Sequence, residues 1–489
     1  MLLDDHVVLS SLTERHFLDF FSKEYGLNIH DHQLDNLREA IKLTCINHDY
    51  LEPEILLQKI ISEPFCQERL FLIEKTTIDE SYFFRDEFQI DFLRNEFLPK
   101  LIEQKRSLAD KQIRIWSAGC STGQEIYSLT ILLHQLLPDY DSWNLHLIGT
   151  DINYQSLNQA KEAEYNAWGI RTNTDFINNS GYFSCLAEDR YVVNDFIKDK
   201  VKFSYLNLAE ETFPSIMQGI CALDLILCRN VFIYFDSVTI KKTCHKFFDS
   251  LNVDGILMLS VTDPLNLSCD LFTTEQSGDV FYFKKKTVAL SYDDPIVVEN
   301  KNNNKLLAAD KVIPQADLSN IKQSIINAMA IADWQSALIL AEKALLVYEA
   351  EAELYQFKAK CLTNLGKMAE ARVACEQSIH YDSVEAHSYL LYGLILMQLG
   401  MLVDAEKAFR QTIFLNYAFM EAHYQLGQVL LYKGQKKDAI KSIQNALAIA
   451  AQEKPERPIH NVISLTYSSF SEVMRNELEL IEKGEVSHG

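Results

Sequence analysis

Long uncharged apolar runs, paired cysteines and basic residues near the start are all missing from this sequence of 489 residues. No run of about 18 uncharged apolar residues occurs, so no membrane-spanning helix is expected. The ten cysteines form no C-x-x-C pair and no clustered His/Cys spacing, which argues against a disulfide framework and against any metal site. The opening MLLDDHVVLSSL is acidic where a secretory signal is basic. We therefore expect a cytoplasmic protein with reduced thiols and no direct membrane insertion.

Basic residues are also too few for a protein that binds phosphate backbones. Lys plus Arg total 46 against 68 Asp plus Glu, a formal net charge of −22. Neutralising phosphates requires the opposite sign, so nucleic acid and anionic lipid are poor partners. A hydrophobic content of 48% excludes global disorder, and the length suggests about three folding units.

The spacing of apolar residues and the composition of the sequence change along the chain. Residues 1–78 have apolar positions at helical spacing, which predicts a small helical domain. From Lys111 onward, short apolar runs such as IRIWSAG and LHLIGTD alternate with helix-length segments, which predicts an α/β domain with buried parallel strands. Residues 289–316 are rich in Asn, Asp and Lys and are predicted to be a solvated linker.

Beyond the linker, small residues recur with a period of 34. The recurring positions are Ala359, Gly393 and Gly427; Gly366, Gly400 and Gly434; and Ala371, Ala405 and Ala439. This spacing resembles tetratricopeptide repeats over residues 317–455, followed by a capping or tail segment over 456–489. A generic helical bundle is the alternative. Stacked helix pairs form a groove for a protein or peptide partner, so we expect the repeats to recruit or regulate across the linker.

A glycine-containing turn follows the first predicted strand. Gly119 and Gly123 lie between IRIWSA and the helical EIYSL, where backbone without side chains can approach a ligand. A second strand ends at Gly149-Thr150-Asp151, and an acid at such a strand end commonly holds ribose hydroxyls. Glycines that serve only packing are the alternative explanation.

Several separate strings together resemble one enzyme family. They are SYFFRD at 81–86, SAGCSTGQEIYSL at 117–129, GTDI at 149–152, VKFSYLNL at 201–208 and LDLILCRNVFIYFD at 223–236. They are similar to the CheR-type chemotaxis methyltransferases, which transfer methyl from S-adenosylmethionine to receptor glutamates. The resemblance implies an N-terminal helical domain and an α/β class I methyltransferase domain over 79–288. That domain has a Rossmann-like sheet and a small antiparallel β insertion near 165–200, and the all-α repeat solenoid follows it.

The resemblance also implies roles for individual residues. Arg85 is expected to pair with the carboxylate of S-adenosyl-L-methionine, Asp151 with its ribose, and Asn207 and Leu208 with its adenine. Arg85, Arg229, Asn230 and Tyr234 are expected at the methyl-transfer site. The full implied set of cofactor contacts is Asp79, Ser81, Arg85, Gly119, Gly123, Glu125, Asp151, Asn207, Leu208, Arg229 and Asn230.

The implied reaction needs no strong base. A glutamate with a reference pKa of about 4.3 is ionised near neutral pH, so proximity, orientation and a dry site suffice, and S-adenosyl-L-homocysteine is the product. Cys120 and Cys228 lie in the binding motifs next to apolar strands, and we expect them to be buried, inert thiols.

The sequence departs from the family pattern at several positions. Ser81 stands for a threonine, Gln124 for a glutamate, Cys185 for an arginine, and SVTDPL for a His-Ser-Glu string. The change at Cys185 argues against an insertion that grips a receptor tail peptide. Two alternatives therefore stay open: an inactive scaffold that acts through its repeats, and a methyltransferase for a small molecule or nucleic acid. The expected partner remains the cytoplasmic domain of a methyl-accepting chemoreceptor, with the enzyme associated with receptor arrays.

Overall fold

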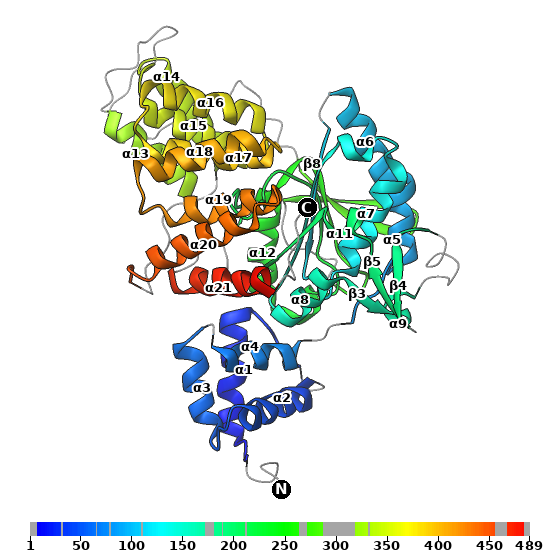
Figure 1. The fold of residues 1–489 in the computed structure, drawn as a ribbon. Coiled ribbons are helices and arrows are strands. Elements are labelled where there is room, and N and C mark those ends of the chain that lie inside the picture. The colour runs from blue at the N-terminus through cyan, green and yellow to red at the C-terminus, as the bar shows by residue number, and fades with distance from the viewer. Residues whose placement is uncertain are drawn as a thin grey trace, which may run out of the picture.

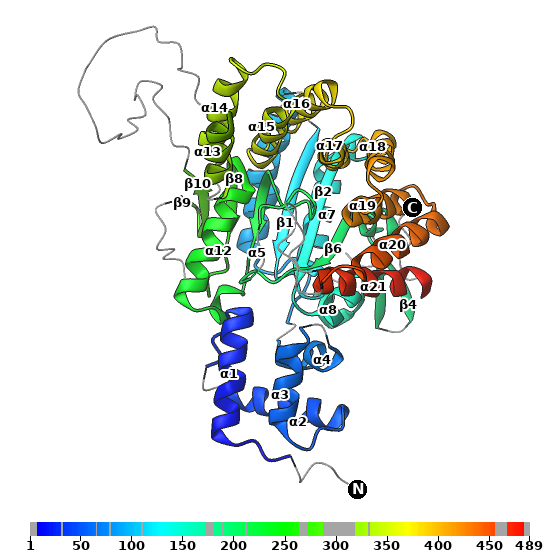
Figure 2. The same cartoon turned by 90° about the vertical axis from the view of Figure 1, so that its left-hand side faces the viewer.

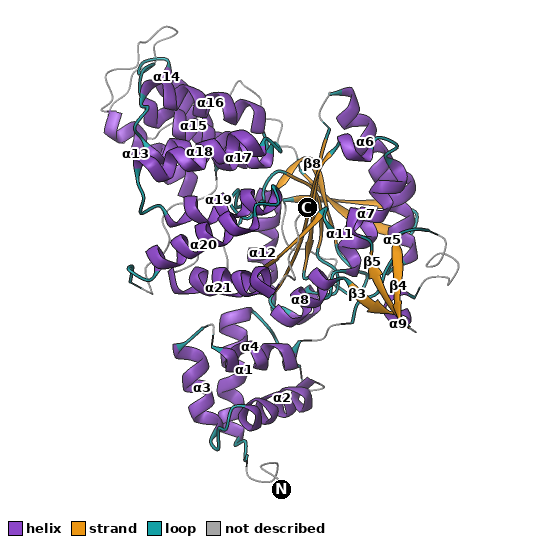
Figure 3. Ribbon diagram, in the orientation of Figure 1, coloured by secondary structure: helices purple, strands orange, loops and turns teal. Residues whose placement is uncertain are grey.

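The computed structural model contains an N-terminal helical unit, a central sheet and a C-terminal helical solenoid (Figures 1 and 3). Asp79 and the predicted linker 289–316 lie outside the residues that it describes. The described residues are 7–30, 33–64, 66–77, 80–108, 111–171, 180–187, 189–210, 213–263, 271–286, 318–330, 333–454 and 467–483.

Four helices build the N-terminal unit around a shared apolar core. They are α1 (Ser11–Tyr25), α2 (Leu34–Asn47), α3 (Pro53–Ser62) and α4 (Gln67–Thr76). Ser10 caps α1 by accepting a hydrogen bond from the Thr13 amide at 3.1 Å, and Gly26 ends the helix with a φ of 65°. The buried faces of the helices meet through Phe17, Leu37 and Ile60, as the apolar spacing predicts.

The central sheet has seven strands in the order β6-β2-β1-β7-β8-β10-β9. The first five strands in this order are parallel to their neighbours, and β10 pairs antiparallel with β8 and β9. The strands are β1 (Gln112–Ala118), β2 (Asn144–Asp151), β6 (Val201–Tyr205), β7 (Leu223–Leu227), β8 (Leu251–Met258), β9 (Phe272–Ser277) and β10 (Val280–Lys285).

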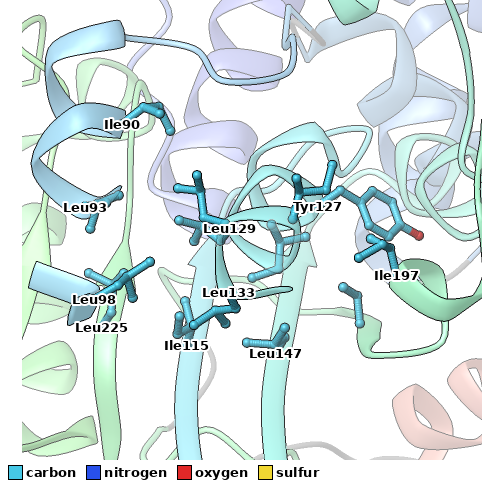
Figure 4. Close-up of a cluster of buried hydrophobic side chains, with 14 of the residues drawn as sticks. Ile90, Leu93, Leu98, Ile115, Tyr127, Leu129, Leu133, Leu147, Ile197 and Leu225 are labelled. Atoms are coloured by element: carbon cyan, nitrogen blue, oxygen red, sulfur yellow. The ribbon is translucent and has the colours of Figure 1, made fainter. Parts of the chain in front are cut away.

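Helices cover both faces of this sheet, which is why its strands are apolar on both sides. Alternate residues of β1 point to opposite cores: Ile115 packs with Leu129 and Leu147 (Figure 4), and Trp116 packs against the rings of Phe213 and Phe247. The helical segments are α5 (Glu87–Phe92), the π-helical η3 (Leu93–Phe97), α6 (Leu98–Ser107), α7 (Gln124–Leu136), η4 (Tyr140–Ser142), α8 (Tyr154–Glu162), η5 (Phe232–Tyr234) and α12 (Ser237–Ser250).

A second, three-stranded sheet is inserted after α8. Its order is β3-β5-β4 and both pairings are antiparallel, as the resemblance implies. Its elements are β3 (Glu164–Asn166), α9 (Ala167–Ile170), β4 (Phe183–Ala187), β5 (Arg190–Val193) and α11 (Asp195–Lys198). The fold is therefore a Rossmann-like, mostly parallel sheet with the expected antiparallel insertion.

In the part of the chain beyond the linker that the structure describes, eight helices form four consecutive pairs and a ninth helix follows them. They are α13 (Leu318–Ala330), α14 (Trp334–Leu345), α15 (Ala352–Asn364), α16 (Met368–Tyr381), α17 (Ala386–Gln398), α18 (Leu402–Leu415), α19 (Met420–Tyr432), α20 (Lys436–Ala450) and α21 (Tyr467–Lys483). In α21, Phe470, Met474 and Ile481 are buried against the last pair, so α21 covers the apolar end of the solenoid.

The recurring glycines have two different physical reasons. A Cβ atom on Gly393 would lie 2.6 Å from the Phe409 ring, so this glycine marks a close approach of paired helices, as predicted. Gly366, Gly400 and Gly434 instead have φ values of 79°, 73° and 68°. They lie in the turns between paired helices, where the left-handed backbone favours glycine.

The repeats pack directly on the central sheet. Gln398, at the end of α17, accepts hydrogen bonds through its carbonyl from the side chains of Gln112 and Asn144 at 2.5 and 3.1 Å. Its side chain accepts from the Arg114 guanidinium at 2.9 Å and donates to the Ile216 carbonyl at 3.2 Å. The repeats and the sheet therefore share a hydrogen-bonded interface, a point that the sequence left open.

The N-terminal helices and the repeat helix α17 lie at opposite ends of the parallel strands, whereas α19 and α21 lie along the β6 side of the sheet (Figure 2). Gln112 and Asn144 begin β1 and β2, so α17 contacts the amino ends of these strands. The N-terminal helices lie at their carboxyl ends. Within the described ranges, no helix is long and apolar enough to cross a membrane.

We expect Gln398→Ala to weaken the contact between the repeats and the sheet. The change leaves the buried Arg114 guanidinium and the Ile216 carbonyl without this partner, at a cost of about 1–3 kcal/mol. The thermal unfolding midpoint should fall, and the radius of gyration from X-ray scattering should rise if the halves separate. Gln435→Ala is the control because Gln435 is exposed and makes no side-chain cap bond. Equal effects of the two changes would contradict the role of Gln398.

Candidate active site

A cavity lies between the carboxyl edge of the central sheet and the N-terminal helices. From the sheet side its lining includes Gly119, Asp151, Asn207, Leu208, Asn230 and Tyr234. From the N-terminal unit its lining includes Tyr25, Asn28, Gln33 and Asn36. Six of the predicted site residues thus meet in one cavity, since parallel neighbouring strands end at the same edge.

The turn after β1 is shaped by its first glycine. Gly119 has a φ of 77°, and its amide donates a hydrogen bond to the Thr150 carbonyl at 2.8 Å. A Cβ atom there would lie 2.4 Å from a methyl group of Val231, so both the backbone conformation and the packing favour glycine. This turn leaves room beside Asp151 for a ligand.

Gly123 is explained by packing. It has a φ of 91° and precedes α7, and a Cβ atom there would meet the side chains of Ala160 and Phe203 at 2.9 and 3.0 Å. Gly123 is not among the residues that line the cavity. The packing alternative considered for the glycine turn therefore accounts for this position.

Asp151 is held in place by the backbone around it. One carboxylate oxygen accepts from the Ser121 amide at 2.8 Å, and the other accepts from the Asn153 amide at 2.9 Å. Burial raises the pKa of Asp151, and these amide hydrogen bonds act in the opposite direction. A carboxylate has about four acceptor sites, so a fixed acceptor remains for hydroxyl groups in the cavity.

Asn207 and Leu208 follow β6 and form the next part of the wall. The Asn207 amide group donates to the Glu24 carbonyl at 2.6 Å and accepts from the Ala209 amide at 3.1 Å. The side chain of Asn207 thus attaches the sheet edge to α1. Leu208 adds a buried apolar surface of the kind that a flat ring can contact.

Asn230 has a strained backbone that a buried carboxylate holds. Its φ is 59°, and its amide donates to Asp263 at 2.7 Å. Asp263 also accepts from the amides of Ser260 and Ile233 at 2.9 and 3.3 Å. The Asn230 side chain donates to the hydroxyls of Ser260 and Thr262 at 3.1 and 2.8 Å.

Asp263 is a residue that our sequence analysis did not select. Sequence analysis noted the string SVTDPL only as a departure from a His-Ser-Glu string, although both strings contain an acid. That acid was the signal that could have identified Asp263 as the partner of the Asn230 backbone.

Tyr234 lies in η5 and is held by the N-terminal unit. Its carbonyl accepts from the Asn28 amide at 2.6 Å, and Phe235 forms an isolated β-bridge with Leu27. Burial raises the pKa of Tyr234, and the charge of Arg85 partly offsets this effect. The hydroxyl is therefore protonated at neutral pH and available as a hydrogen-bond donor.

Arg85, Glu125 and Arg229 are close together but do not line the cavity. Arg229 donates to the Arg85 carbonyl at 2.6 Å and lies 3.4 Å from the Glu125 carboxylate, which also accepts from the Ser117 hydroxyl at 2.6 Å. Arg229 is buried, so it connects the segment of Arg85 to the start of α7. The Arg85 guanidinium itself donates to the Glu80 carbonyl at 2.7 Å.

The structure also shows the positions of Ser81, Gln124 and the two cysteines in the binding motifs. The Ser81 carbonyl accepts from the Gln124 side chain at 3.4 Å. Cys120 and Cys228 are buried, as predicted, and burial raises the pKa of Cys228 well above its usual value, which disfavours its reactive thiolate form.

A glycine turn, an acid at the end of the second strand and a cavity at the carboxyl edge of such a sheet are the features of an α/β fold that binds a nucleoside. The model of the CheR methyltransferase, SAM binding domain, matches residues 79–280, and that of the tetratricopeptide repeat matches 352–383 and 421–453. The chain belongs to the CheR family of S-adenosylmethionine-dependent protein-glutamate methyltransferases.

Two curated relatives illustrate the similarity. The chemotaxis protein methyltransferase of Borreliella burgdorferi is 35% identical over 195 residues, which are 40% of this chain and 67% of that protein. Chemotaxis protein methyltransferase 2 of Vibrio cholerae is 29% identical over 221 residues, 45% of this chain and 72% of that protein. The crystal structure of MamA has a TM-score of 0.27 at 23% identity, covering 28% of this chain and 82% of that chain.

The residues that line the cavity are chemically suited to the nucleoside of S-adenosylmethionine. Asp151 offers a fixed acceptor for ribose hydroxyls, the Gly119 turn allows close approach, and Leu208 provides an apolar wall.

We therefore expect Asp151→Ala to weaken binding of S-adenosylhomocysteine by about 1–3 kcal/mol, or about 5- to 150-fold. Calorimetry on the full chain measures this change. The control Asp141→Ala removes an exposed acid at the other end of β2. Unchanged affinity in Asp151→Ala would place the ribose elsewhere.

We expect Asp263→Ala to lower both stability and turnover, because it removes the acceptor of three backbone amides around Asn230. Asp263→Asn keeps one carbonyl acceptor and should recover part of both losses. Thermal unfolding and initial rates measure the two effects. If Asp263→Ala kept wild-type rates, the Asn230 conformation would not matter for the reaction.

Proposed function

We propose that this chain transfers methyl from S-adenosylmethionine to glutamate side chains of a chemoreceptor cytoplasmic domain. The products are glutamate methyl esters and S-adenosylhomocysteine. The observation that carries the proposal is the convergence of Asp151, Asn207 and Tyr234 on one cavity, from the ends of β2, β6 and β7.

The chemistry asks the protein mainly for placement. When bound, S-adenosylmethionine supplies a methyl group that the positive sulfonium activates. The acceptor glutamate is ionised near neutral pH, so no general base has to remove a proton first. The side chains of this chain bind, orient and exclude water, which favours in-line transfer.

Each candidate residue has a proposed role in that placement. Asp151 holds the ribose hydroxyls, and Asn207 and Leu208 border the adenine. Arg85, whose planar fork suits a carboxylate, binds the amino-acid end of the cofactor. Asp79, Ser81, Gly119 and Glu125 complete the proposed cofactor contacts, whereas Gly123 follows in the same turn and is needed for packing against Ala160 and Phe203.

The methyl-transfer side is assigned to Arg229, Asn230 and Tyr234, together with Arg85. Tyr234 is proposed to place its hydroxyl near the reacting groups. Arg229 is proposed to act through its contacts with Arg85 and Glu125, which hold two cofactor-binding segments together.

We propose that the parts of the chain have different roles. We propose a helical domain over 1–78, a methyltransferase domain over 79–288, a linker over 289–316, repeats over 317–455 and a capping segment over 456–489. The repeats bind a protein or peptide partner, and the methyltransferase acts in the cytoplasm at receptor arrays, where the methyl-accepting domains lie.

Labelled methyl transfer tests the proposed function. The purified chain is incubated with methyl-labelled S-adenosylmethionine and candidate receptor cytoplasmic domains, and the label is then exposed to mild base. We expect base-labile label on glutamate. Stable label would indicate N-methylation, and cofactor binding without transfer to any receptor would favour the inactive-scaffold alternative.

We expect Tyr234→Phe to lower turnover more than affinity for S-adenosylhomocysteine, since the hydroxyl is assigned to the methyl-transfer side.

Arg85→Lys should weaken cofactor binding although it keeps the charge, because a point ammonium cannot reproduce a planar fork. Initial rates and calorimetry separate the two effects. Equal losses in rate and affinity for Tyr234→Phe, or full activity of Arg85→Lys, would contradict these roles.

A further inference from the structure

A second and larger cavity lies along β6 and shares no lining residue with the candidate active site. Its volume is about 500 Å³, within the range of about 300–1,000 Å³ that is typical of ligand sites. Parts far apart in the sequence enclose it: α2 and α4 of the N-terminal unit, α8 and β6 of the sheet, and α19 and α21 of the repeats. We call it the β6-edge cavity.

The main chain of β6 runs along this cavity. Strand β6 is the last strand at one edge of the seven-stranded sheet. All of its residues from Val201 to Tyr205 line the cavity, although successive side chains of a strand point to opposite faces. The cavity therefore follows the edge itself, where amide and carbonyl groups that do not pair with β2 are directed. Such an edge is a template for pairing with another extended chain.

Three lysines line the β6-edge cavity, and one of them, Lys198, pairs with Asp195 at 3.7 Å. The other two, Lys161 and Lys202, come from α8 and β6. Within the described part of the chain, neither ammonium group lies within 4.0 Å of a carboxylate oxygen. The Lys202 ammonium instead lies 4.4 Å from the centre of the Tyr432 ring. Burial lowers the pKa of both lysines, that of Lys202 to about 8, and the negative charge of Glu477 offsets this effect only in part.

Of the acids that line the cavity, Glu477 acts on Lys161 and Lys202 through its charge, but its hydrogen bonds go to other side chains. Glu477 accepts hydrogen bonds from the Tyr424 hydroxyl at 2.9 Å and from the Gln428 side chain at 2.7 Å. Glu74 pairs with Lys75 at 2.8 Å. The remaining acid, Asp199, experiences the charges of the adjacent Lys198 and Lys200.

Aromatic rings form apolar parts of the same wall. Tyr154 and Tyr205 stack with ring centres 4.8 Å apart and planes 8° apart. Tyr424 and Phe470 meet edge to face with centres 4.9 Å apart. These rings offer contact surface for the uncharged side chains of a bound segment.

We propose that the β6-edge cavity binds an extended acidic peptide segment of a protein partner, which adds to the central sheet beside β6 and places carboxylates near Lys161 and Lys202. This mode of recognition uses main-chain hydrogen bonds for affinity and alternate side chains for specificity. Five strand residues span about 16 Å at about 3.3 Å per residue, so the segment has about five residues. A phosphate-bearing small molecule would use the lysines but would leave the strand edge unpaired, and the edge therefore favours a peptide.

Because the repeats form one wall of the site, the bound segment contacts both halves of the enzyme. Tyr424 and Glu477 come from the repeats and α21, while Lys161 and Lys202 come from the methyltransferase domain. The site is separate from the cavity that contains Asp151, so the segment is a recruiting element and not the methyl-accepting glutamate.

Selection of peptides on the full chain tests the proposal. A display library of random heptapeptides is selected on the wild-type protein and, in parallel, on the double variant K161Q/K202Q. A second double variant, K100Q/K407Q, removes two exposed lysines from α6 and α18 and serves as the charge-matched control. Enriched peptides are then synthesised with normal and with N-methylated backbone amides, and their binding is measured by fluorescence anisotropy.

We expect the wild-type protein and K100Q/K407Q to enrich sequences with acidic residues at alternate positions. These peptides should bind K161Q/K202Q at least about tenfold more weakly than the wild-type protein, and their N-methylated forms should bind the wild-type protein at least about tenfold more weakly. Hydrogen exchange of the amides in 201–205 should slow when a peptide binds. Absence of acidic enrichment, equal binding by K161Q/K202Q, or equal binding of N-methylated peptides would overturn the proposal. Binding of nucleoside phosphates in place of peptides would also overturn it. These readouts do not involve methyl transfer, so they are independent of the proposed function.

Discussion

The structure depends on one constraint: the central strands are parallel, so their carboxyl ends share an edge and their amino ends share the opposite edge. The candidate active site uses the first edge, where the turn after β1 and Asp151 after β2 meet the segment that contains Asn230. The amide of Ser121 binds the Asp151 carboxylate and connects two of these loops at 2.8 Å. The repeats use the opposite edge through Gln398, so the solenoid packs on the sheet without covering the cavity.

The N-terminal helices complete the site. Their contacts with the sheet edge include the bond from Asn28 to Tyr234 and the bond from Asn207 to Glu24. Both use backbone groups of the N-terminal unit, while on the sheet side one of them depends on the Asn207 side chain. The net acidity of residues 1–75, with seven basic and fourteen acidic side chains, offers no support for a basic receptor-docking face. Acidic partner segments are matched better by Lys161 and Lys202 at the β6-edge cavity.

Much of the fold could be predicted because its signals are local. Buried strands, the repeat period of 34 and the acid at Asp151 each occupy a short stretch of sequence. Long-range pairings carry no such signal: Gln398 bonds to Ile216 across 182 positions, and Asp263 binds the Asn230 amide across 33. Gly123 shows a second limit of prediction. A glycine that is needed for packing against Ala160 looks in the sequence like a glycine that is needed for ligand binding. The roles of Arg85 and Arg229 stay predictions, as both lie beside the cavity and not in its lining.

The central claim is that the carboxyl edge of the sheet, closed by the N-terminal helices, binds the nucleoside of the methyl donor. A crystal structure of the full chain with S-adenosylhomocysteine tests it most directly. The account predicts ribose hydroxyls within hydrogen-bonding distance of the Asp151 carboxylate and the adenine against Leu208. A nucleoside bound anywhere else, including the β6-edge cavity, would contradict the account.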